Sequence, residues 1–410
     1  MEVLYERCCG LDVHKKMVVA CVITPEGMVT RTFPTMTGDL LQLADWLRSF
    51  KVTHVAMEST GPYWKPIYNV LESEFELTLA NANNIKIVPG RKTDVKDGEW
   101  IATLLRHGLI KNSFVPDRSQ RELRELVRYR RSLIQESTRE VNRIQKVLEG
   151  ANIKLGDVAS DVLGASGRAM LQAIARGEDN PETLADLAKG RLRDKHAELL
   201  KALRGLVGPH QRVIIKVQME HLDFLDGQIA KLDEQINDRM KDSGESIKLL
   251  DSIPGVDVRS AQDILAEIGT DMDQFPSANH LASWAGVCPG NNRSAGKRKS
   301  GRTVKGNRWL RAALVVAARG SLRRKGRTYF NAQYHRLAAR RGDKRAIMAI
   351  AHSILIDIYH MLRGGAPYVD LGPDYFDKRS IAATVRRSVE RIERLGYKVT
   401  LEVPQAVFSE

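Results

Sequence analysis

The sequence predicts an α/β domain at the amino-terminal end of the chain, followed by a mainly all-α remainder. Residues 1–110 alternate short β-branched runs with helical segments. Residues 121–148 and 221–240 keep apolar residues at steps of three and four, and aromatic residues make up only 6% of the chain. Because 410 residues exceed one ordinary core, we expect several domains, at 1–112, 113–245, 246–370 and 371–410.

The first region predicts a mixed sheet flanked by helices. Apolar, β-branched runs predict strands at 5–13, 16–24, 28–33, 54–59 and 76–80. Helical spacing predicts helices at 38–50, at 64–74 and from Thr93 onward. The short Pro25–Gly27 turn makes the second and third strands an antiparallel hairpin, and alternating β and α units follow it.

The second region predicts a coiled-coil hairpin. Apolar residues recur at steps of three and four in 121–148 and again in 221–240, and shorter helices are expected in the glycine-rich stretch 150–208. We interpret the long helices as an oligomerisation arm that pairs with a partner chain. A plain helical bundle linking two domains is the alternative.

The third region begins with a helix, a Pro254–Gly255 turn and a second helix. Such a hairpin can present backbone N–H groups to a phosphate, or it can be a simple αα-hairpin. Residues 386–403 predict a last helix and a last strand, and they contain no motif that indicates a catalytic or binding function.

Charge and cysteine content bound the class of protein. Lysine and arginine number 64 against 50 acidic residues, a net charge of +14, which favours a polyanionic partner such as DNA or RNA. By composition alone a generally basic, soluble protein is an equal alternative. The cysteines have neither CxxC spacing nor a histidine at zinc-finger distance. We interpret them as small core residues of a protein in a reducing compartment. They are Cys8, Cys9, Cys21 and Cys288. No run of ~18 apolar residues predicts a membrane span, and residues 1–10 lack signal-peptide features. We expect a cytoplasmic protein without a membrane partner.

Carboxylates occupy positions where a buried charge is costly. Asp12 lies within one predicted strand, Glu58 ends another, and Asp94 and Asp97 share a face at the entrance of an apolar helix. Each alone reads as a surface residue, and Asp94 as a helix cap. If the four converge they repel one another unless cations are present. We therefore predict an Mg²⁺ site, with Mn²⁺ as its substitute, of the kind that holds the oxygens of a phosphodiester.

A basic segment precedes an apolar helix that starts near Asn307. Its glycine-, asparagine- and serine-rich part predicts a loop, which could cradle phosphates. Its cationic residues, predicted to bind nucleic acid, are Arg293, Lys297, Arg298, Lys299, Arg302, Lys305, Arg308 and Arg311. Ser294 lies among them, where a base or metal and nearby cations could make a serine nucleophilic. By composition alone Ser294 is an ordinary loop serine, and Ser300 is an equal candidate.

The order of these motifs resembles a known family. A strand aspartate, a strand-end glutamate and a later Asp-x-x-Asp helix are the arrangement of ribonuclease-H-like nucleases and integrases. The stretches "GLDVHK", "MESTGPYW", "KTDVKDGEWIA", "IPGV", "WAGVCPGNNRSAGKRKSGRTVKGNRWLR" and "AARG" together resemble the DEDD transposases of bacterial insertion sequences, described as bridge-RNA-guided recombinases. The resemblance runs to about Arg363.

The resemblance implies an amino-terminal RuvC-like domain, a coiled-coil arm and a carboxy-terminal transposase domain with a serine nucleophile. It places the metal tetrad on Asp12, Glu58, Asp94 and Asp97 and the nucleophile on Ser294. It further implies a structured non-coding guide RNA that pairs with donor and target DNA, and dimers that pair as a tetramer. The expected enzyme is a Mg²⁺-dependent DNA recombinase that forms a phosphoserine intermediate, cytoplasmic and nucleoid-associated.

Three alternatives stay open at this point. The first is a RuvC-like, Mg²⁺-dependent junction-resolving nuclease that uses water. The second is a tyrosine recombinase with Tyr329 or Tyr334 as nucleophile near Arg327 and Arg336, against which the acidic tetrad argues. The third is a non-enzymatic RNA-binding scaffold whose acids are ordinary surface charge.

Overall fold

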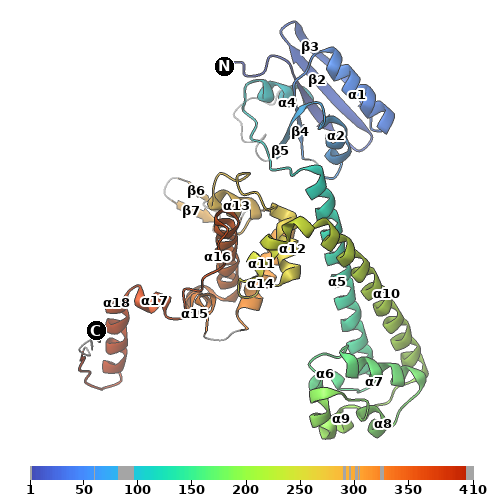
Figure 1. Ribbon diagram of the computed structural model, residues 1–410, viewed down its shortest axis with the longest axis vertical. Helices are drawn as coiled ribbons and strands as arrows, with labels where there is room; N and C mark the ends of the chain where they lie inside the picture. The colour runs from blue at the N-terminus through green and yellow to red at the C-terminus, as the bar shows by residue number, and fades with distance from the viewer. Residues whose placement is uncertain are drawn as a thin grey trace. The chain divides into compact units, whose positions relative to one another are not determined.

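The chain divides into two compact units. The computed structural model describes residues 2–59, 61–81, 97–289, 292–294, 297–300, 303, 305–323 and 327–402. The first unit is Met1–Arg118 and the second is Ser119–Glu410. Figure 1 labels their helices and strands.

The first unit is built on a five-stranded mixed sheet. Its strands are β1 (Cys8–Val13), β2 (Met17–Thr24), β3 (Gly27–Pro34), β4 (His54–Glu58) and β5 (Glu76–Ala80), in the order β3-β2-β1-β4-β5. The strands β1, β2 and β3 pair antiparallel, whereas β1 with β4 and β4 with β5 pair parallel. The predicted α/β class and the β2–β3 hairpin are confirmed.

Helices cover both faces of this sheet. The helices α1 (Thr37–Ser49) and α2 (Trp64–Leu71) pack on one face, where Leu11, Val55 and Met57 are fully buried. The helix α4 (Asp97–Arg106) packs on the other face against a smaller cluster that contains Cys21 and Ala56. Figure 1 shows α4 and α1 on opposite sides of the strands. The predicted start of this last helix, at Thr93, lies outside the described residues.

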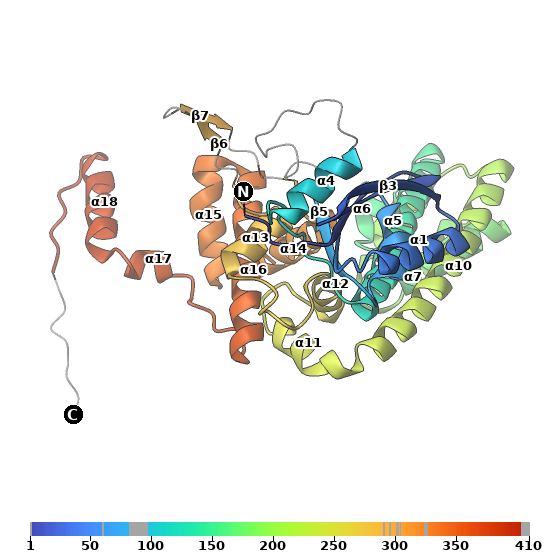
Figure 2. The ribbon, with the colours of Figure 1, turned by 90° about the horizontal axis from the view of Figure 1, so that it is seen from above.

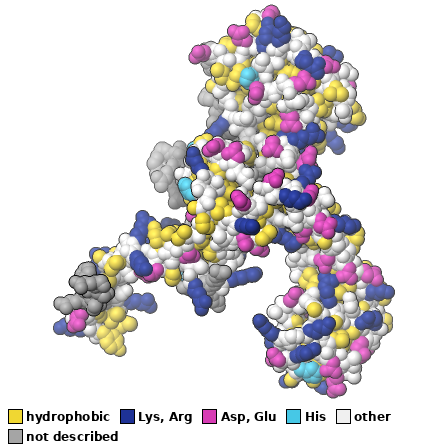
Figure 3. Space-filling model, viewed as in Figure 1, with side chains coloured by type: hydrophobic (Ala, Val, Ile, Leu, Met, Phe, Trp, Pro, Cys, Tyr) yellow, Lys and Arg dark blue, Asp and Glu magenta, His cyan; other side chains and the backbone are white. Residues whose placement is uncertain are grey.

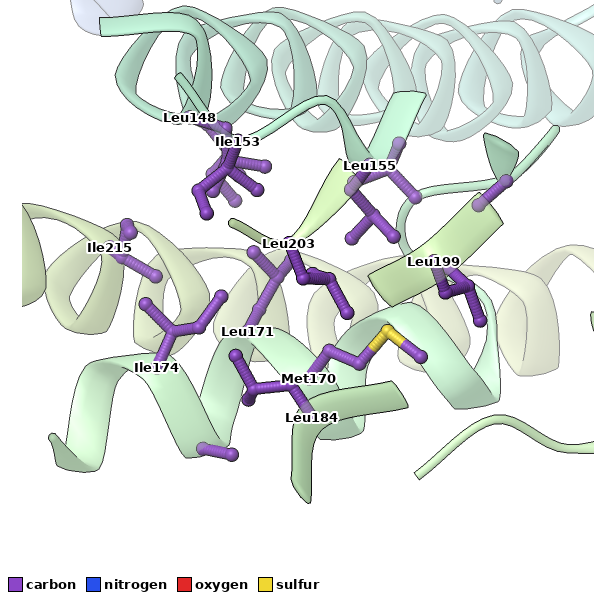
Figure 4. Close-up of a cluster of buried hydrophobic side chains, with 14 of the residues drawn as sticks. Leu148, Ile153, Leu155, Met170, Leu171, Ile174, Leu184, Leu199, Leu203 and Ile215 are labelled. Carbon is purple, nitrogen blue, oxygen red and sulfur yellow. The ribbon is translucent and has the colours of Figure 1, made fainter. Parts of the chain in front are cut away.

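The second unit begins with a long helical hairpin. The helices α5 (Arg118–Gly150) and α10 (Pro209–Arg239) run side by side in Figure 1. They are antiparallel, because Glu122 near the start of α5 pairs with Arg239 at the end of α10 at 3.0 Å. Short helices join them: α6 (Leu155–Val158), α7 (Ala165–Arg176), α8 (Pro181–Ala185), η1 (Gly190–Lys195) and α9 (His196–Ala202). Figure 4 shows the apolar core, including Leu148, Met170 and Leu203, that closes this end.

The predicted apolar stripe of α5 is only partly the buried face. Val127, Leu133, Ile144 and Leu148 are buried as the spacing predicts. Polar side chains interrupt that face, since Arg124, Arg130 and Glu140 are buried as well. A hairpin of helices is therefore present, but its interior is partly ionic.

The rest of the second unit is a helical bundle around α16. Its elements are η2 (Lys241–Ser243), α11 (Gly244–Asp251), α12 (Val258–Ile268), α13 (Ala278–Ala285), β6 (Asn292–Ser294), β7 (Lys297–Ser300), α14 (Arg308–Ser321), α15 (Tyr329–Arg341), α16 (Asp343–Gly364), α17 (Tyr375–Lys378) and α18 (Ile381–Glu393). Among the described residues only α16 is long and apolar enough to cross a membrane. It packs against α11, α13, α14 and α15, and half of its most apolar window is buried, as in the core helix of a folded domain.

Two expectations for this region are wrong. The segment predicted as a loop contains the antiparallel hairpin β6–β7, because backbone hydrogen bonds can pair strands without an apolar alternation. The last strand predicted near the carboxy-terminal end does not form in residues 397–402, which follow α18 without regular structure.

Candidate functional site

Asp12 and Glu58 occupy matching positions on two neighbouring parallel strands. Leu11 of β1 is paired with Met57 of β4, and each acid follows its paired residue by one position. Leu11 and Met57 point into the core beneath α1 and α2. Because successive side chains alternate between faces, the two acids belong to the opposite face, which α4 covers. Both are partly exposed.

Helix α4 reaches this face through a glycine-to-glycine contact. A Cβ atom on Gly10 would lie 2.3 Å from the carbonyl oxygen of Gly98 and 2.3 Å from the amide nitrogen of Ala102. A Cβ on Gly98 would lie 3.7 Å from the amide nitrogen of Asp12. The first turn of α4 therefore lies on the backbone of β1 beside Asp12. Asp97, the first residue of α4, is exposed there.

Three of the four predicted acids thus come from separate elements to one end of one sheet face. They are Asp12, Glu58 and Asp97, and Asp94 lies outside the described residues. Among the residues that the structure describes, no group of three or more His, Cys, Asp or Glu side chains is close enough together to hold a metal ion. The carboxylates of Asp12 and Glu58, near the ends of the neighbouring strands β1 and β4, offer the hard oxygen donors that Mg²⁺ prefers, so the donor chemistry fits this metal.

A histidine that the sequence analysis did not select contacts this site. The Nε2 atom of His14 lies 3.1 Å from Oδ2 of Asp12. The backbone N–H of His14 donates to the carbonyl of Met17, which fixes the turn between β1 and β2. His14 therefore orients the Asp12 carboxylate. The signal for it was its spacing of two from Asp12, which places both side chains on one side of an extended chain.

Both candidate serines lie on the β6–β7 hairpin of the second unit. Ser294 pairs with Lys297 next to the connection, and Ser300 pairs with Asn292 at the other end of the ladder. The carboxylates belong to the first unit, so the chain carries the two predicted halves of its chemistry in separate units. Of the predicted cationic residues, Lys297, Lys305 and Arg308 are exposed and Arg311 is partly exposed. Arg302 lies outside the described residues, and the structure describes Arg293, Arg298 and Lys299 by their backbone.

The segment that carries the hairpin is fixed where it joins α14. Asn307 caps α14 by accepting hydrogen bonds from the N–H groups of Trp309 and Leu310 at 3.0 and 3.1 Å. Its own side-chain amide donates to Glu267 at 2.6 Å. A Cβ on Gly306 would lie 2.3 Å from the nitrogen of Gly286, so the two ends of the segment touch through their backbones.

Glu267 joins this segment to the long arm. It is 1% exposed, and it accepts hydrogen bonds from Nε and Nη2 of Arg128 on α5 at 2.7 and 2.8 Å. Arg124 of α5 lies 3.5 Å from the same carboxylate. A second buried residue, Arg130, is 1% exposed and donates to Asp233 and Asp263 at 2.8 and 2.7 Å. Burial raises the pKa of Asp263 above its ordinary value.

The sequence pattern did not identify these arginines as buried residues. Their signal was the spacing of four between Arg124 and Arg128, which puts both on one face of α5. Apolar spacing alone assigns arginine to solvent. The correct interpretation needed the acids of α10 and α12, which are more than a hundred residues away in the chain.

The Pro254–Gly255 turn packs as an αα-hairpin. A Cβ on Gly255 would lie 2.2 Å from the nitrogen of Ser321 and 2.3 Å from the carbonyl oxygen of Ala317, both in α14. Its φ of +89° also favours glycine. The glycine therefore allows the turn to touch α14, which favours the structural interpretation of this hairpin over phosphate binding.

The candidate tyrosines have environments that disfavour nucleophilic attack. The hydroxyl of Tyr334 donates to Oδ1 of Asp343 at 2.9 Å, and this hydrogen bond raises the pKa of Tyr334. Burial raises the pKa of Tyr329. A phenol that is harder to deprotonate is a weaker nucleophile.

Two family models match this chain. Residues 9–153 match a model for DEDD transposases of the IS110 type, described as "Transposase". Residues 247–335 match a model described as "Transposase IS116/IS110/IS902 family". The first match spans the sheet, α4 and α5, and the second spans α11 to the start of α15, including both candidate serines.

Several curated proteins resemble it over most of their length. The "Insertion element IS110 uncharacterized 43.6 kDa protein" of Streptomyces coelicolor is 29% identical over 315 residues, which are 71% of this chain and 75% of the relative. The "Insertion element IS900 uncharacterized 42 kDa protein" of Mycobacterium paratuberculosis is 27% identical over 334 residues, 71% of this chain and 80% of the relative. A putative transposase of Sinorhizobium fredii is 26% identical over 324 residues, 77% of this chain and 74% of the relative.

Proposed function

Because the chain belongs to the IS116/IS110/IS902 family of transposases, we propose that it cuts and rejoins the donor and target DNA of its insertion sequence through a serine-linked intermediate. The chain is a DNA transposase. The matching positions of Asp12 and Glu58 at the ends of adjacent strands carry the proposal.

The proposed metal ligands are Asp12, Glu58, Asp94 and Asp97. Asp12 and Glu58 supply carboxylates from one sheet face, and the Gly10–Gly98 contact brings the first turn of α4 beside them. A bound Mg²⁺, or Mn²⁺ in its place, would polarise the scissile phosphate and offset the charge that develops on it. His14 would hold the Asp12 carboxylate in position.

Ser294 is the proposed nucleophile. Its Oγ atom attacks the scissile phosphorus and loses its proton as the Oγ–P bond forms. The bond from phosphorus to the 3′ oxygen breaks, and that oxygen takes up a proton. A 3′-hydroxyl from the other DNA then attacks the phosphoserine, which restores the serine. Because the ester keeps the energy of the original bond, strand exchange needs no ATP. The carboxylates that act with a given Ser294 come from the same chain or from a partner chain.

Positive charge supports nucleic-acid partners. A net charge of +14 favours the binding of polyanions. On the face that Figure 3 shows, Lys and Arg side chains lie on both units. We propose that a structured non-coding RNA pairs with both DNAs and supplies sequence specificity, while the residues from Arg293 to Arg311 bind backbone. The protein would then act in the cytoplasm, at the nucleoid.

The arm is the proposed site of assembly. The helix α10 exposes Val213, Val217 and Phe224, whose spacing of four and seven residues forms one stripe. An exposed apolar stripe of this kind suits a helix of a second copy. We propose that dimers form on each DNA and pair as a tetramer. In this scheme residues 1–112 hold the metal, 113–245 assemble, 246–370 carry the serine and 371–410 form an extension.

Detection of a covalent protein–DNA adduct tests this function. Purified protein is mixed with Mg²⁺, flanking RNA and paired, labelled DNA substrates, and adducts are resolved under denaturing conditions. The wild type and Ser300→Ala should form a serine-linked adduct, and Ser294→Ala should form none. Cleavage without an adduct would favour a water-using nuclease. An adduct that persists in Ser294→Ala but is lost in Tyr329→Phe or Tyr334→Phe would favour a tyrosine recombinase.

A further inference from the structure

A groove of about 750 Å³ lies between α15 and the segment of α17 and α18. Its chemistry is dominated by arginine: Arg336 and Arg340 from α15, Arg379 after α17, and Arg387 from α18 line it. Asp377 is the acidic residue among its described lining. Figure 2 shows α17 leading from the bundle to α18, and in Figure 3 dark-blue and yellow side chains lie together over these helices.

An aromatic cluster holds the wall of this groove in place. Tyr329 at the start of α15 stacks on Phe376 with ring centroids 5.3 Å apart, and it meets Tyr375 edge-on at 5.2 Å. The carboxylate of Asp370 accepts hydrogen bonds from the N–H groups of Tyr329 and Gly372 at 2.9 and 2.7 Å. These contacts tie residues 370–376 to α15, so the groove is a built feature rather than a gap beside a loose tail.

The four arginines keep their charge available. The guanidinium of Arg336 lies 4.7 Å from the centre of the Phe376 ring, which orients it without neutralising it. Within the described part of the chain, none of the four pairs with a carboxylate. By contrast, Arg319 nearby in the bundle forms a two-point ion pair with Asp343. Four exposed cations that line one groove with a single acid repel one another until an anion binds.

A sugar–phosphate backbone fits this arrangement. A guanidinium presents a planar fork of donors that matches phosphate oxygens, and several arginines from different elements suit a polymer with repeated phosphates. Contacts between guanidinium groups and phosphate oxygens carry no base-sequence information, so binding of this kind would not depend on sequence. Most of the groove lies beyond residue 335, where the family match ends.

We infer that this arginine groove is a second nucleic-acid binding site, separate from the basic segment 293–311, and that it holds the backbone of a DNA or RNA strand. The inference rests on the proposed function only for the kind of ligand. It assigns the carboxy-terminal extension a role in holding nucleic acid.

Binding of labelled oligonucleotides to the full-length protein tests the groove. Duplex DNA, single-stranded DNA and single-stranded RNA of one sequence are titrated without Mg²⁺ over a range of salt concentrations. In the double variant Arg379→Ala and Arg387→Ala, affinity should fall for at least one probe. The salt-dependence slope should drop by about 1.8 for duplex DNA or about 1.4 for a single strand. The probe that responds identifies the nucleic acid that the groove holds.

Two further variants make the test specific. The double variant Arg386→Ala and Arg391→Ala removes two charges from α18 outside the groove, where Arg386 lies 3.8 Å from Glu390. The salt-dependence slope of this variant should stay close to that of the wild type. The double variant Arg379→Lys and Arg387→Lys should restore the slope, which separates lost charge from misfolding. Wild-type slopes in the groove variant with all three probes, or equal drops in both alanine variants, would overturn the inference. Because no cleavage is measured, either result leaves the Ser294 proposal to its own adduct test.

Discussion

Gly10 and Gly98 form the contact at which helix α4 lies directly on strand β1. A Cβ atom on Gly10 would lie 2.3 Å from the carbonyl oxygen of Gly98, so a side chain at position 10 would have to push α4 away from β1. This contact sets the first turn of α4, with Asp97, beside the Asp12 end of β1. Its two glycines are separated by 88 positions, and they connect the two parts of the proposed metal site.

Replacing Gly10 by alanine should destabilise the protein and impair DNA cleavage. The new methyl group would collide with the backbone of α4, and we expect a cost of about 3 kcal/mol in the free energy of unfolding. Denaturant unfolding measures this. Gly38→Ala in α1 is the matched control, because no atom lies within 4 Å of its added Cβ. A Gly10→Ala protein as stable as the control would show that the close contact does not exist.

Neutralising either Asp12 or Glu58 should stop catalysis without unfolding the protein. Asp12→Asn and Glu58→Gln keep the shape of the side chain but remove the charge that would bind metal, so Mg²⁺-dependent DNA cleavage should fall at least about 100-fold. Asp45→Asn on α1, whose acid pairs with Arg48 at 2.7 Å, should retain wild-type cleavage. Full activity in Asp12→Asn would remove this residue from the metal site.

Removing Glu267 should separate the arm from the segment that carries Ser294. Glu267→Ala would leave Arg124 and Arg128 without their buried carboxylate and Asn307 without its acceptor. Breaking a buried ion pair in this way costs about 3–5 kcal/mol. The exposed Glu245→Ala on α11 should change the free energy of unfolding by no more than about 0.5 kcal/mol. Equal unfolding midpoints for the two variants would contradict the structural role of Glu267.

Asp357 should make stability depend on pH. Burial raises the pKa of this carboxyl from 3.8 to about 6 in the folded protein. The folded state then holds the proton more tightly than the unfolded state, so the contribution of Asp357 to stability is lost as pH rises from 3.8 to about 6. The slope is at most about 1.4 kcal/mol per pH unit. Asp357→Asn should lack this decline when unfolding is measured across that window. Parallel curves for variant and wild type would contradict it.

Much of the first unit can be predicted from its sequence. The apolar, β-branched runs locate β1, β2 and β5 within three residues of their observed ends, and the short turn at Pro25 predicts the hairpin. Once β1 and β4 are recognised as parallel neighbours, Asp12 and Glu58 are expected to lie near each other, at the carboxyl ends of these two strands. The sequence does not predict how close α4 approaches, because that depends on two glycines that meet only in the folded chain.

The second unit is harder to predict for physical reasons. The strands β6 and β7 are polar, so their pairing depends on backbone hydrogen bonds that leave no apolar period. Arg130 is buried because Asp233 and Asp263 neutralise it from distant helices, and no local pattern reports such partners. The arginine groove has the same origin, since its four cations come from α15, from α18 and from Arg379 between α17 and α18.

The most direct test of the proposed metal site is an anomalous difference map from crystals of the protein with DNA and Mn²⁺. We predict a peak between the carboxylates of Asp12 and Glu58, on the sheet face that α4 covers and within reach of Asp97. A map without a peak there, from crystals grown at a Mn²⁺ concentration that supports cleavage in solution, would contradict the proposal.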